Sequence, residues 1–326
     1  MEGLGELPLF PDGASWDEAR AILLDHELCD GLPMVPPTEA RLTAMLEGAA
    51  PGPSFGNMPP LFGDLTAGAV AYQCVLAGCT PGALPLVLTA AEACLEPSFN
   101  LLGILTTTGT PAVMTVVHGP IAGALGMNAS TNCLGPGNHA NATLGRALAL
   151  VMLNIAGARA GVGDMATMGQ PGKYGVCLPE GDDDSLPSLP ARRGLKGDCV
   201  TVLGISGTAE VLPGGNGDTP EDILAPMAAA MASALAVASA GRERDLGEQY
   251  FLLPPELAQQ IAKRGWDLAD IRQFLFAALF DSRPIARTAE DIHPIVTGGP
   301  GVKMTYLPLW AGGTLSVTRN IRAFRS

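Results

Sequence analysis

A run of amides and a Gly-Pro-Gly loop are the first residues in this chain that could do chemistry. Four Asn fall between positions 128 and 141, and the loop at 135–137 leads into an apolar helix predicted at about 144–158. Free backbone N–H groups and the helix dipole at such a start favour an anion. The alternative is a capped helix with a structural Arg–Asp pair. The candidate substrate-binding residues of this segment are Asn138, Asn141, Thr143 and Arg146, whose guanidinium could grip a carboxylate or phosphate.

A second candidate segment surrounds a strand predicted at 174–178. Lys173 stands at the start of this strand and Glu180 beyond its end, so either could serve as a general acid or base. Cys177 could be a nucleophile if its pKa were lowered. Because side chains alternate along a strand, Lys173 and Cys177 are expected to point the same way. The structural alternatives are a buried, inert Cys177 and a solvated acidic loop that begins at Glu180.

His118 follows two valines and precedes Gly119-Pro120, at the expected end of a strand. Ligands of open α/β folds bind beyond strand ends, so this position suits a catalytic histidine, with a hydrogen-bonded structural role as the alternative. A metal centre is not predicted, because the His and Cys residues show no HxH, HxxxH or CxxC spacing. The side chains weighed for such a centre are Cys79, Cys133, His118 and His139. The sequence identifies no cofactor.

Alternating helices and strands must position these residues. Apolar helices are predicted at 84–95, 144–158 and 223–239, and each is followed by two short strands. The strands are expected at 101–105, 174–178 and 250–253, and at 116–123, 202–209 and 295–302. This order predicts an α/β or α+β layered fold. One interpretation is three weak helix-strand-strand repeats at about 83–127, 143–215 and 221–303.

The first sixty residues have a different pattern. Ser15 with Glu18 predicts a capping box at a helix start, and Thr38 caps a second helix that reaches about residue 47. Three prolines between positions 33 and 37 favour an extended segment. We therefore predict an N-terminal arm at 1–60 that is rich in Pro and poor in core residues, followed by one main domain at 61–326.

Four motifs resemble a poorly characterised bacterial family. They are DGLPMVPPT at 30–38, AGCTP at 77–81, GPGNHANATLGRA at 135–147 and PGKYGVCLPE at 171–180. The family resembles proteins associated with partners that carry a UGSC motif, in which selenocysteine or cysteine precedes Gly-Ser-Cys. The resemblance implies functional roles for Asp30, Cys79, Asn141, Arg146, Lys173 and Glu180, and it adds Asp30 and Cys79 to the substrate-binding residues. The chain carries no UGSC motif itself, so the resemblance implies a separate partner protein.

Composition argues against two classes of partner, nucleic acids and membranes, and indicates where the protein is found. The net charge is −13 with only 16% charged residues, whereas a nucleic acid or an anionic membrane would need a basic surface. No apolar run reaches the roughly 20 residues of a membrane span, and the N-terminal residues show no signal-peptide pattern. Seven Cys, an odd number, suggest reduced thiols. We therefore expect a cytoplasmic protein without structural disulfides.

Two functional hypotheses follow from these residues. The first is an enzyme, a lyase or an oxidoreductase, that acts on a small anionic or polar metabolite by acid–base or thiol-assisted chemistry. The second is a non-catalytic subunit that docks a thiol or selenol partner of the UGSC type.

A homo-oligomer is expected from the apolar composition and the Ala-rich helix at 225–240, which either lies centrally in the chain or packs against a second copy. A dimer is the simplest closed form, and the 1–60 arm is expected to reach across its interface. Light scattering at micromolar concentration should give about twice the chain mass. A mass near 33.4 kDa would contradict the prediction.

Overall fold

Helices and strands alternate through the chain, and the computed structural model describes residues 7–239, 247–280 and 282–322. The helices are α1 (Trp16–Asp25), α2 (Glu39–Leu46), α3 (Ala67–Ala77), α4 (Leu84–Cys94), α5 (Leu101–Thr106), α6 (Ile121–Ala124), α7 (His139–Asn154), α8 (Leu189–Arg192), α9 (Pro220–Ser239), α10 (Pro255–Lys263) and α11 (Leu268–Phe276), with short 3-10 turns η1 (Pro97–Phe99), η2 (Pro171–Tyr174) and η3 (Ala289–Asp291). The strands are β1 (Ser54–Met58), β2 (Gly63–Thr66), β3 (Ala112–His118), β4 (Val176–Pro179), β5 (Cys199–Ile205), β6 (Ala209–Val211), β7 (Gln249–Leu253), β8 (Leu279–Phe280), β9 (Arg283–Pro284), β10 (Ile292–Val296), β11 (Met304–Leu307) and β12 (Val317–Asn320).

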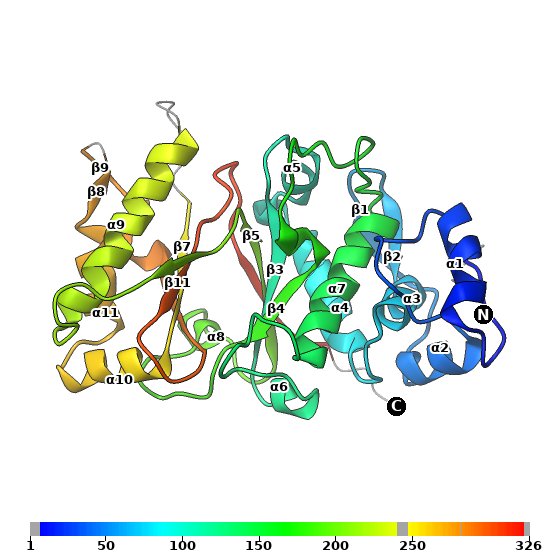
Figure 1. Cartoon of the computed structure of the whole chain (residues 1–326), viewed down its shortest axis with the longest axis horizontal. Coiled ribbons are helices and arrows are strands. Elements are labelled where there is room, and N and C mark those ends of the chain that lie inside the picture. The colour runs from blue at the N-terminus through cyan, green and yellow to red at the C-terminus, as the bar shows by residue number, and fades with distance from the viewer. Residues whose placement is uncertain (1–6, 240–246, 281, 323–326) are drawn as a thin grey trace.

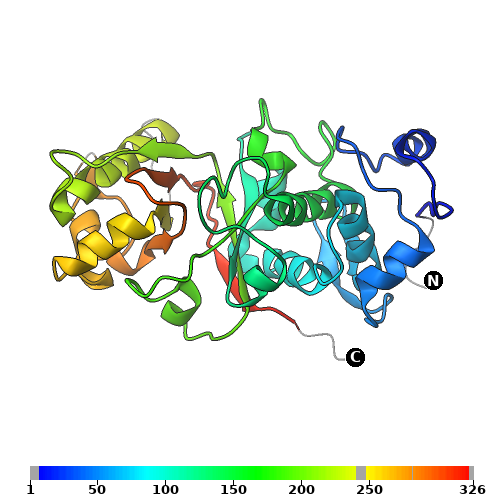
Figure 2. The same cartoon turned by 60° about the horizontal axis from the view of Figure 1, so that its bottom comes forward.

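Two four-stranded sheets lie side by side in the middle of the molecule, and helices cover the outer side of each (Figure 1). The first sheet has the order β12-β5-β3-β4 and the second the order β10-β7-β11-β6. Helices α3, α4 and α7 lie beyond the first sheet and α9, α10 and α11 beyond the second, an order that Figure 2 shows from another side. The layers are helix, sheet, sheet and helix. The chain therefore has the layered fold of helices and strands that its sequence predicts.

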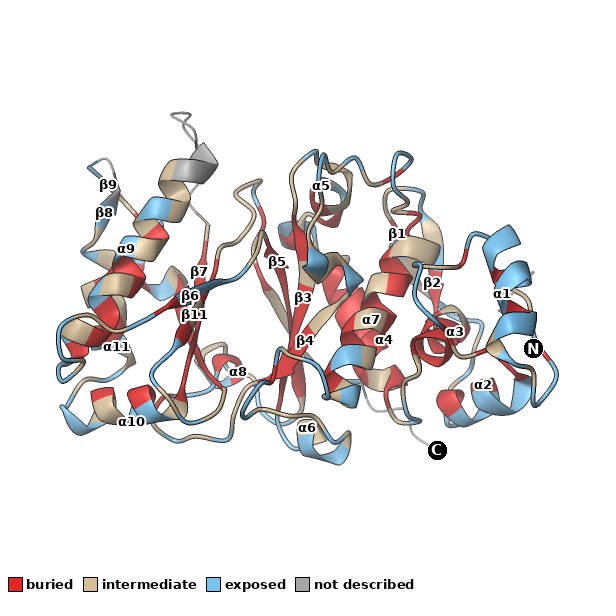
Figure 3. Ribbon diagram, in the orientation of Figure 1, coloured by how far each residue is buried: buried red, intermediate tan, exposed pale blue. Residues whose placement is uncertain are grey.

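Side-chain alternation along the strands divides the core into three parts. Met114 and Val116 of β3 face the second sheet, whereas Val117 faces the helices. In the same way Tyr250 of β7 faces the first sheet and Phe251 faces its own helices. Successive side chains of a strand point to opposite faces, so a strand that is buried on both faces needs apolar residues at successive positions. Figure 3 shows the inner strands in red, and β3, β5 and β7 are buried along nearly their whole length.

The two sheets share one pattern of strand directions and exchange one strand each. In each sheet a parallel pair forms one edge (β3 with β4, β7 with β10), and a third strand, β5 or β11, runs antiparallel to the inner strand of that pair. The fourth strand comes from the other half: β6 follows β5 but joins the second sheet, and β12 follows β11 but joins the first. The crossing segments also pair, with a bridge between Ile205 and Leu309. Neither sheet is complete without both halves of the chain.

The predicted elements agree with the structure in part. The strands at 250–253, 202–209 and 295–302 correspond to β7, β5 with β6, and β10, although β10 starts and ends earlier. The strand expected at 101–105 is wrong, because this segment is helix α5. Asn100 caps that helix by accepting a hydrogen bond from the Gly103 N–H at 3.2 Å, and a short apolar run cannot distinguish helix from strand. The first of the three expected units therefore lacks its first strand, and the interpretation as three repeats stays a prediction.

The N-terminal segment shares the core of the first half of the chain. The capping box of Ser15 and Glu18 and the cap at Thr38 are both present, as predicted. Leu23 of α1 and Leu42 of α2 are fully buried in the same apolar cluster as α3, α4 and α7. The expectation of an arm poor in core residues is therefore wrong for residues 7–60, and residues 1–6 lie outside the described part.

Helix α9 covers the outer side of the second sheet with one face. Its buried residues Ile223, Leu224, Met227 and Met231 belong to the cluster that contains α10 and α11. Residue 240, at the end of the predicted Ala-rich helix, lies outside the described residues. All seven cysteines are free, as predicted. None of the helices in the described residues has the length and apolarity that a membrane span requires.

The packing of α1 can be tested with two neighbouring leucines. Leu23 is fully buried and Leu24 is 46% exposed. Leu23→Ala should lower the free energy of unfolding by about 2–5 kcal/mol, because it leaves a cavity in the shared core. Leu24→Ala is the matched control and should change it by about 0.5 kcal/mol or less. Denaturant unfolding measures both, and equal small effects would show that α1 is not part of the core.

Candidate functional site

A cavity of about 900 Å³ lies between α7, the start of β3 and the loop that leads to β4. Helix α7 contributes Ala149, Met152 and Leu153 to its wall, and β3 contributes Ala112 and Val113. The volume is within the range of pockets that enclose small organic ligands. The apolar wall would exclude water from a bound ligand and strengthen polar contacts to it.

An ion pair between Lys173 and Asp164 lies in the lining of this cavity. The Lys173 Nζ donates to Asp164 Oδ2 at 2.5 Å, and both side chains are largely shielded from solvent. Lys173 is part of η2, a turn that Pro171 opens, and Gly175 ends it with a φ of 124°. A side chain at 175 would collide with the backbone of Gly145 and Arg146, so the chain needs glycine there.

The turn at Lys173 separates it from Cys177. Because β4 starts only at Val176, the two residues do not share a strand, and the prediction that they point the same way is wrong. Cys177 packs in the core beneath α7, and burial raises the pKa of its thiol well above the usual range. A buried thiol that stays protonated is unsuited to nucleophilic attack. Cys177 is therefore placed as a core residue.

A different thiol, Cys29, lines the cavity. Burial, together with the neighbouring Asp30 carboxylate, raises the pKa of Cys29. Its thiol would therefore act as a proton donor rather than as a thiolate at neutral pH. Cys29, Asp164 and Tyr174 line the cavity but were not identified from the sequence. Cys29 directly precedes the DGLP motif and Tyr174 lies within PGKYGVCLPE, so both had a signal, whereas Asp164 lies outside the four motifs.

Arg146 is fully engaged by the segment that contains Asp30. Its Nε and one Nη bond the two Asp30 carboxylate oxygens at 2.7 and 2.9 Å, and the other Nη bonds the Pro33 carbonyl at 2.8 Å. This is the structural Arg–Asp pair, the alternative to a ligand-binding arginine. The DGLP and GRA motifs, far apart in the sequence, thus meet in one contact that holds one side of the cavity.

The amides of the Gly-Pro-Gly segment bond the loop itself. Asn141 accepts from the Asn128 N–H and donates to the carbonyls of Asn128 and Cys133. Asn138 donates to the carbonyls of Asn132 and Gly135. These bonds use most of the capacity of each amide group, so little is left for a ligand. The amides predicted to bind substrate therefore stabilise the loop before α7.

Two further predicted residues serve the same region. The Thr143 hydroxyl donates to the His139 carbonyl at 2.9 Å, within the first turns of α7. The Cys79 thiol donates to the Thr143 carbonyl at 3.3 Å, and this bond connects the loop between α3 and α4 to α7. Neither residue lines the cavity of about 900 Å³.

His118 and Glu180 lie together but at the other end of the first sheet. His118 Nδ1 is 2.7 Å from Glu180 Oε2, and His118 Nε2 is 2.8 Å from the Thr201 hydroxyl oxygen. Glu180 also accepts from the Leu189 N–H at the start of α8. His118 lies six positions after Ala112 of the cavity wall along β3, a distance of about 20 Å. The predicted catalytic residues therefore belong to two separate places.

The Glu180–His118–Thr201 chain resembles a catalytic triad in its bonding but lies between the two sheets. Thr201 has no exposed surface, and its hydroxyl also bonds Thr318 at 2.8 Å. The hydrogen-bonded structural role, the alternative for His118, therefore fits its surroundings. Among the described residues, no group of three His, Cys, Asp or Glu could hold a metal ion.

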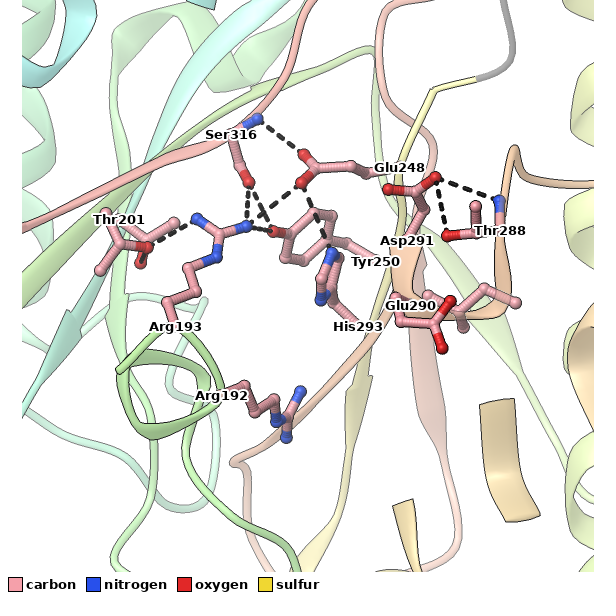
Figure 4. A network of polar contacts seen from close by, with 12 residues as sticks. Arg192, Arg193, Thr201, Glu248, Tyr250, Thr288, Glu290, Asp291, His293 and Ser316 are labelled. Carbon is pink, nitrogen blue, oxygen red and sulfur yellow. Dashed lines mark hydrogen bonds and ion pairs between the residues drawn. The ribbon is translucent and has the colours of Figure 1, made fainter. Parts of the chain in front are cut away.

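The polar chain continues from Thr318 into the second sheet through Arg193 (Figure 4). Arg193 also bonds Glu248, Tyr250 and Ser316, and His293 lies 3.4 Å from Glu248 and stacks on Tyr250. Burial alone would raise the pKa of Glu248, but the contacts with His293, the Ser316 N–H and Arg193 outweigh it and lower that pKa. Charged groups in this layer are thus held by one another rather than by water.

Comparisons with known proteins do not identify a family for this chain. No protein-family model matches it, and neither the search of curated proteins nor the search of solved structures found a match. The functional argument therefore depends on the geometry of the chain alone.

The Arg146–Asp30 contact can be measured by a double-mutant cycle with Arg146→Ala and Asp30→Ala. Both side chains are more than four-fifths buried and the bond is two-pronged, so the coupling in the free energy of unfolding should be about 1–3 kcal/mol. The exposed pair of Arg159 and Glu27, 3.6 Å apart, is the control and should couple by about 0–1 kcal/mol. A coupling for Arg146 and Asp30 no larger than that of the control would contradict the structural role.

Proposed function

We propose that this chain is an enzyme that binds a small polar or anionic metabolite in the cavity of about 900 Å³. The observation that supports the proposal is the Lys173–Asp164 pair in a mostly apolar wall. A few charged groups inside a mostly apolar pocket are typical of sites that bind small polar ligands. A lyase or oxidoreductase reaction remains the expected class.

The chemistry follows from what each group can do. The Asp164 carboxylate can accept a proton from a bound metabolite, and the Lys173 ammonium can stabilise the negative charge that develops. Arg159, also in the lining, offers a second positive charge for the anionic part of the ligand. The Cys29 thiol, kept protonated by its surroundings, can return a proton from the other side of the cavity.

A second candidate function is the docking of a thiol or selenol partner of the UGSC type. The loop around the cavity exposes large apolar side chains, with Met168 87% and Val162 65% exposed and Met165 and Tyr174 about half exposed. Clustered apolar side chains on a surface are typical of interaction sites. A partner seated there would bring its own thiol or selenol to the cavity. Reduced cysteines and a cytoplasmic location fit both candidates, and a homo-oligomer stays a prediction.

The enzyme proposal predicts that filling the cavity abolishes ligand binding. Ala149→Phe, which points a ring into the cavity, should remove the metabolite that the wild-type protein retains from a metabolite extract, as read by native mass spectrometry. Ala142→Phe, at an exposed position in the first turn of the same helix and outside the cavity lining, is the matched control and should retain it. Equal retention by both variants would place the ligand elsewhere.

The charge pair has its own test once a substrate is retained. Lys173→Gln and Asp164→Asn keep the side-chain sizes and should each lower turnover by about 100-fold or more, the usual contribution of a general acid or base. If the isolated chain shows no turnover and activity appears only with a co-purified partner, the docking function replaces the enzyme proposal. Unchanged turnover in both variants would exclude the pair from catalysis.

A further inference from the structure

Two arginines outside the proposed cavity hold the free edge of β10. Arg192, at the end of α8, donates to the Pro294 carbonyl at 2.7 Å, and Arg272 of α11 donates to the Ile292 carbonyl at 2.9 Å. Pro294 has no N–H to give to a sheet, so it requires an edge strand with this side unpaired. Carbonyls two residues apart on a strand point the same way, about 7 Å from each other. The two guanidinium groups therefore meet the same edge, close together.

Neither guanidinium has a carboxylate partner among the described residues. Arg192 bonds only the carbonyls of Pro187 and Pro294, and Arg272 bonds the carbonyls of Glu290 and Ile292 and approaches His293 at 3.5 Å. One Nη of Arg192 is buried without any hydrogen-bond partner. In Figure 4 no contact joins Arg192 to the other side chains drawn, whereas both Nη atoms of the neighbouring Arg193 are joined to other side chains by dashed lines.

The nearby carboxylates are already committed to other groups. Glu180 bonds His118, and Glu248 bonds Arg193 and His293. Asp291 caps η3 through Thr288 and faces Arg287, and Glu290 is exposed. Burial lowers the pKa of Arg192 to about 10 and also lowers the pKa of Arg272, and the nearby carboxylates, Glu180 for Arg192 and Glu290 and Asp291 for Arg272, only partly offset this effect. A buried cation without a counter-charge is costly unless an anion binds to it.

A cavity lies beside this pair of cations, and Arg272 lines it whereas Arg192 does not. Its volume is about 470 Å³, and its lining includes Arg272, Glu290 and the start of α11, together with Pro187, whose carbonyl holds Arg192. Asp267, also in the lining, turns its carboxylate to the N–H groups of Ala269 and Asp270. We propose that Arg272 binds an oxyanion, the phosphate or carboxylate group of a small ligand that enters this cavity, and that the positive charge of Arg192, held behind the cavity wall by the Pro187 carbonyl, strengthens this binding.

This site lies on the second sheet and does not involve the cavity beside Lys173. Planar guanidinium groups with fixed positions suit two-pronged contacts with phosphate or carboxylate oxygens. The backbone carbonyls already hold both arginines in place, so little side-chain freedom would be lost on binding. Glu290, the one free carboxylate in the lining, would oppose the anion.

The test is calorimetric titration of the full chain with inorganic phosphate, and separately with acetate, at low ionic strength. Phosphate should bind the wild-type protein, and Arg192→Gln and Arg272→Gln should each weaken it about tenfold or more. Glu290→Gln should tighten binding several-fold, because it removes a like charge. Lys263→Gln, which removes an exposed positive charge on α10, is the control and should leave binding unchanged. Stronger binding of acetate than of phosphate would assign the site to carboxylate ligands.

A second measurement follows thermal unfolding. Phosphate should raise the thermal unfolding temperature of the wild-type protein above its value in sodium chloride of equal ionic strength, and Arg272→Lys should retain part of that rise. The proposal is overturned if neither phosphate nor acetate binds or stabilises the wild-type protein. It is equally overturned if folded Arg192→Gln and Arg272→Gln variants bind as tightly as the wild type.

Discussion

The exchange of β6 and β12 between the two sheets is the constraint on which the rest of the fold depends. Each sheet takes its last strand from the opposite half of the chain, and the crossing segments pair at Ile205 and Leu309. The inner faces of the two sheets therefore pack against each other and share one buried apolar cluster. Apolar side chains such as Met114, Val116 and Leu252 fill this layer.

Polar groups that fall in this inner layer must find partners there, and this requirement explains most of the buried ionic contacts. His118 and Thr201 alternate onto the inner face by their place on β3 and β5, and the chain of bonds from Glu180 to Arg193 satisfies them. His118, at the end of its strand, has a hydrogen-bonded structural role because the second sheet covers the position where a ligand would bind in an open sheet. Arg192, beside this chain, is left without a side-chain partner, and the oxyanion site follows from that imbalance.

Local features were predictable from the sequence, and contacts between distant segments were not. The caps at Ser15 and Thr38 and the strand β7 depend on neighbouring residues, so patterns of spacing revealed them. The strand expected at 101–105 is helix α5, because six residues are too few to distinguish the hydrophobic period of a helix from that of a strand. The prediction that Lys173 and Cys177 lie on one face of a strand is wrong because Lys173 belongs to the turn η2, and this turn has no strong signal in the sequence. The motifs that contain Asp30 and Arg146 are both visible in the sequence, but only the fold shows that these two side chains bond each other.

The central claim is that the functional site lies at the Lys173 end of the first sheet and not at the His118 end. A crystal structure of the protein soaked with a library of small polar and anionic fragments would test it most directly. The structure predicts fragment density in the cavity of about 900 Å³, in contact with Lys173 and the Met152 wall, and none beside His118. Density against His118 and Glu180, with the cavity beside Lys173 unoccupied in every soak, would contradict the claim.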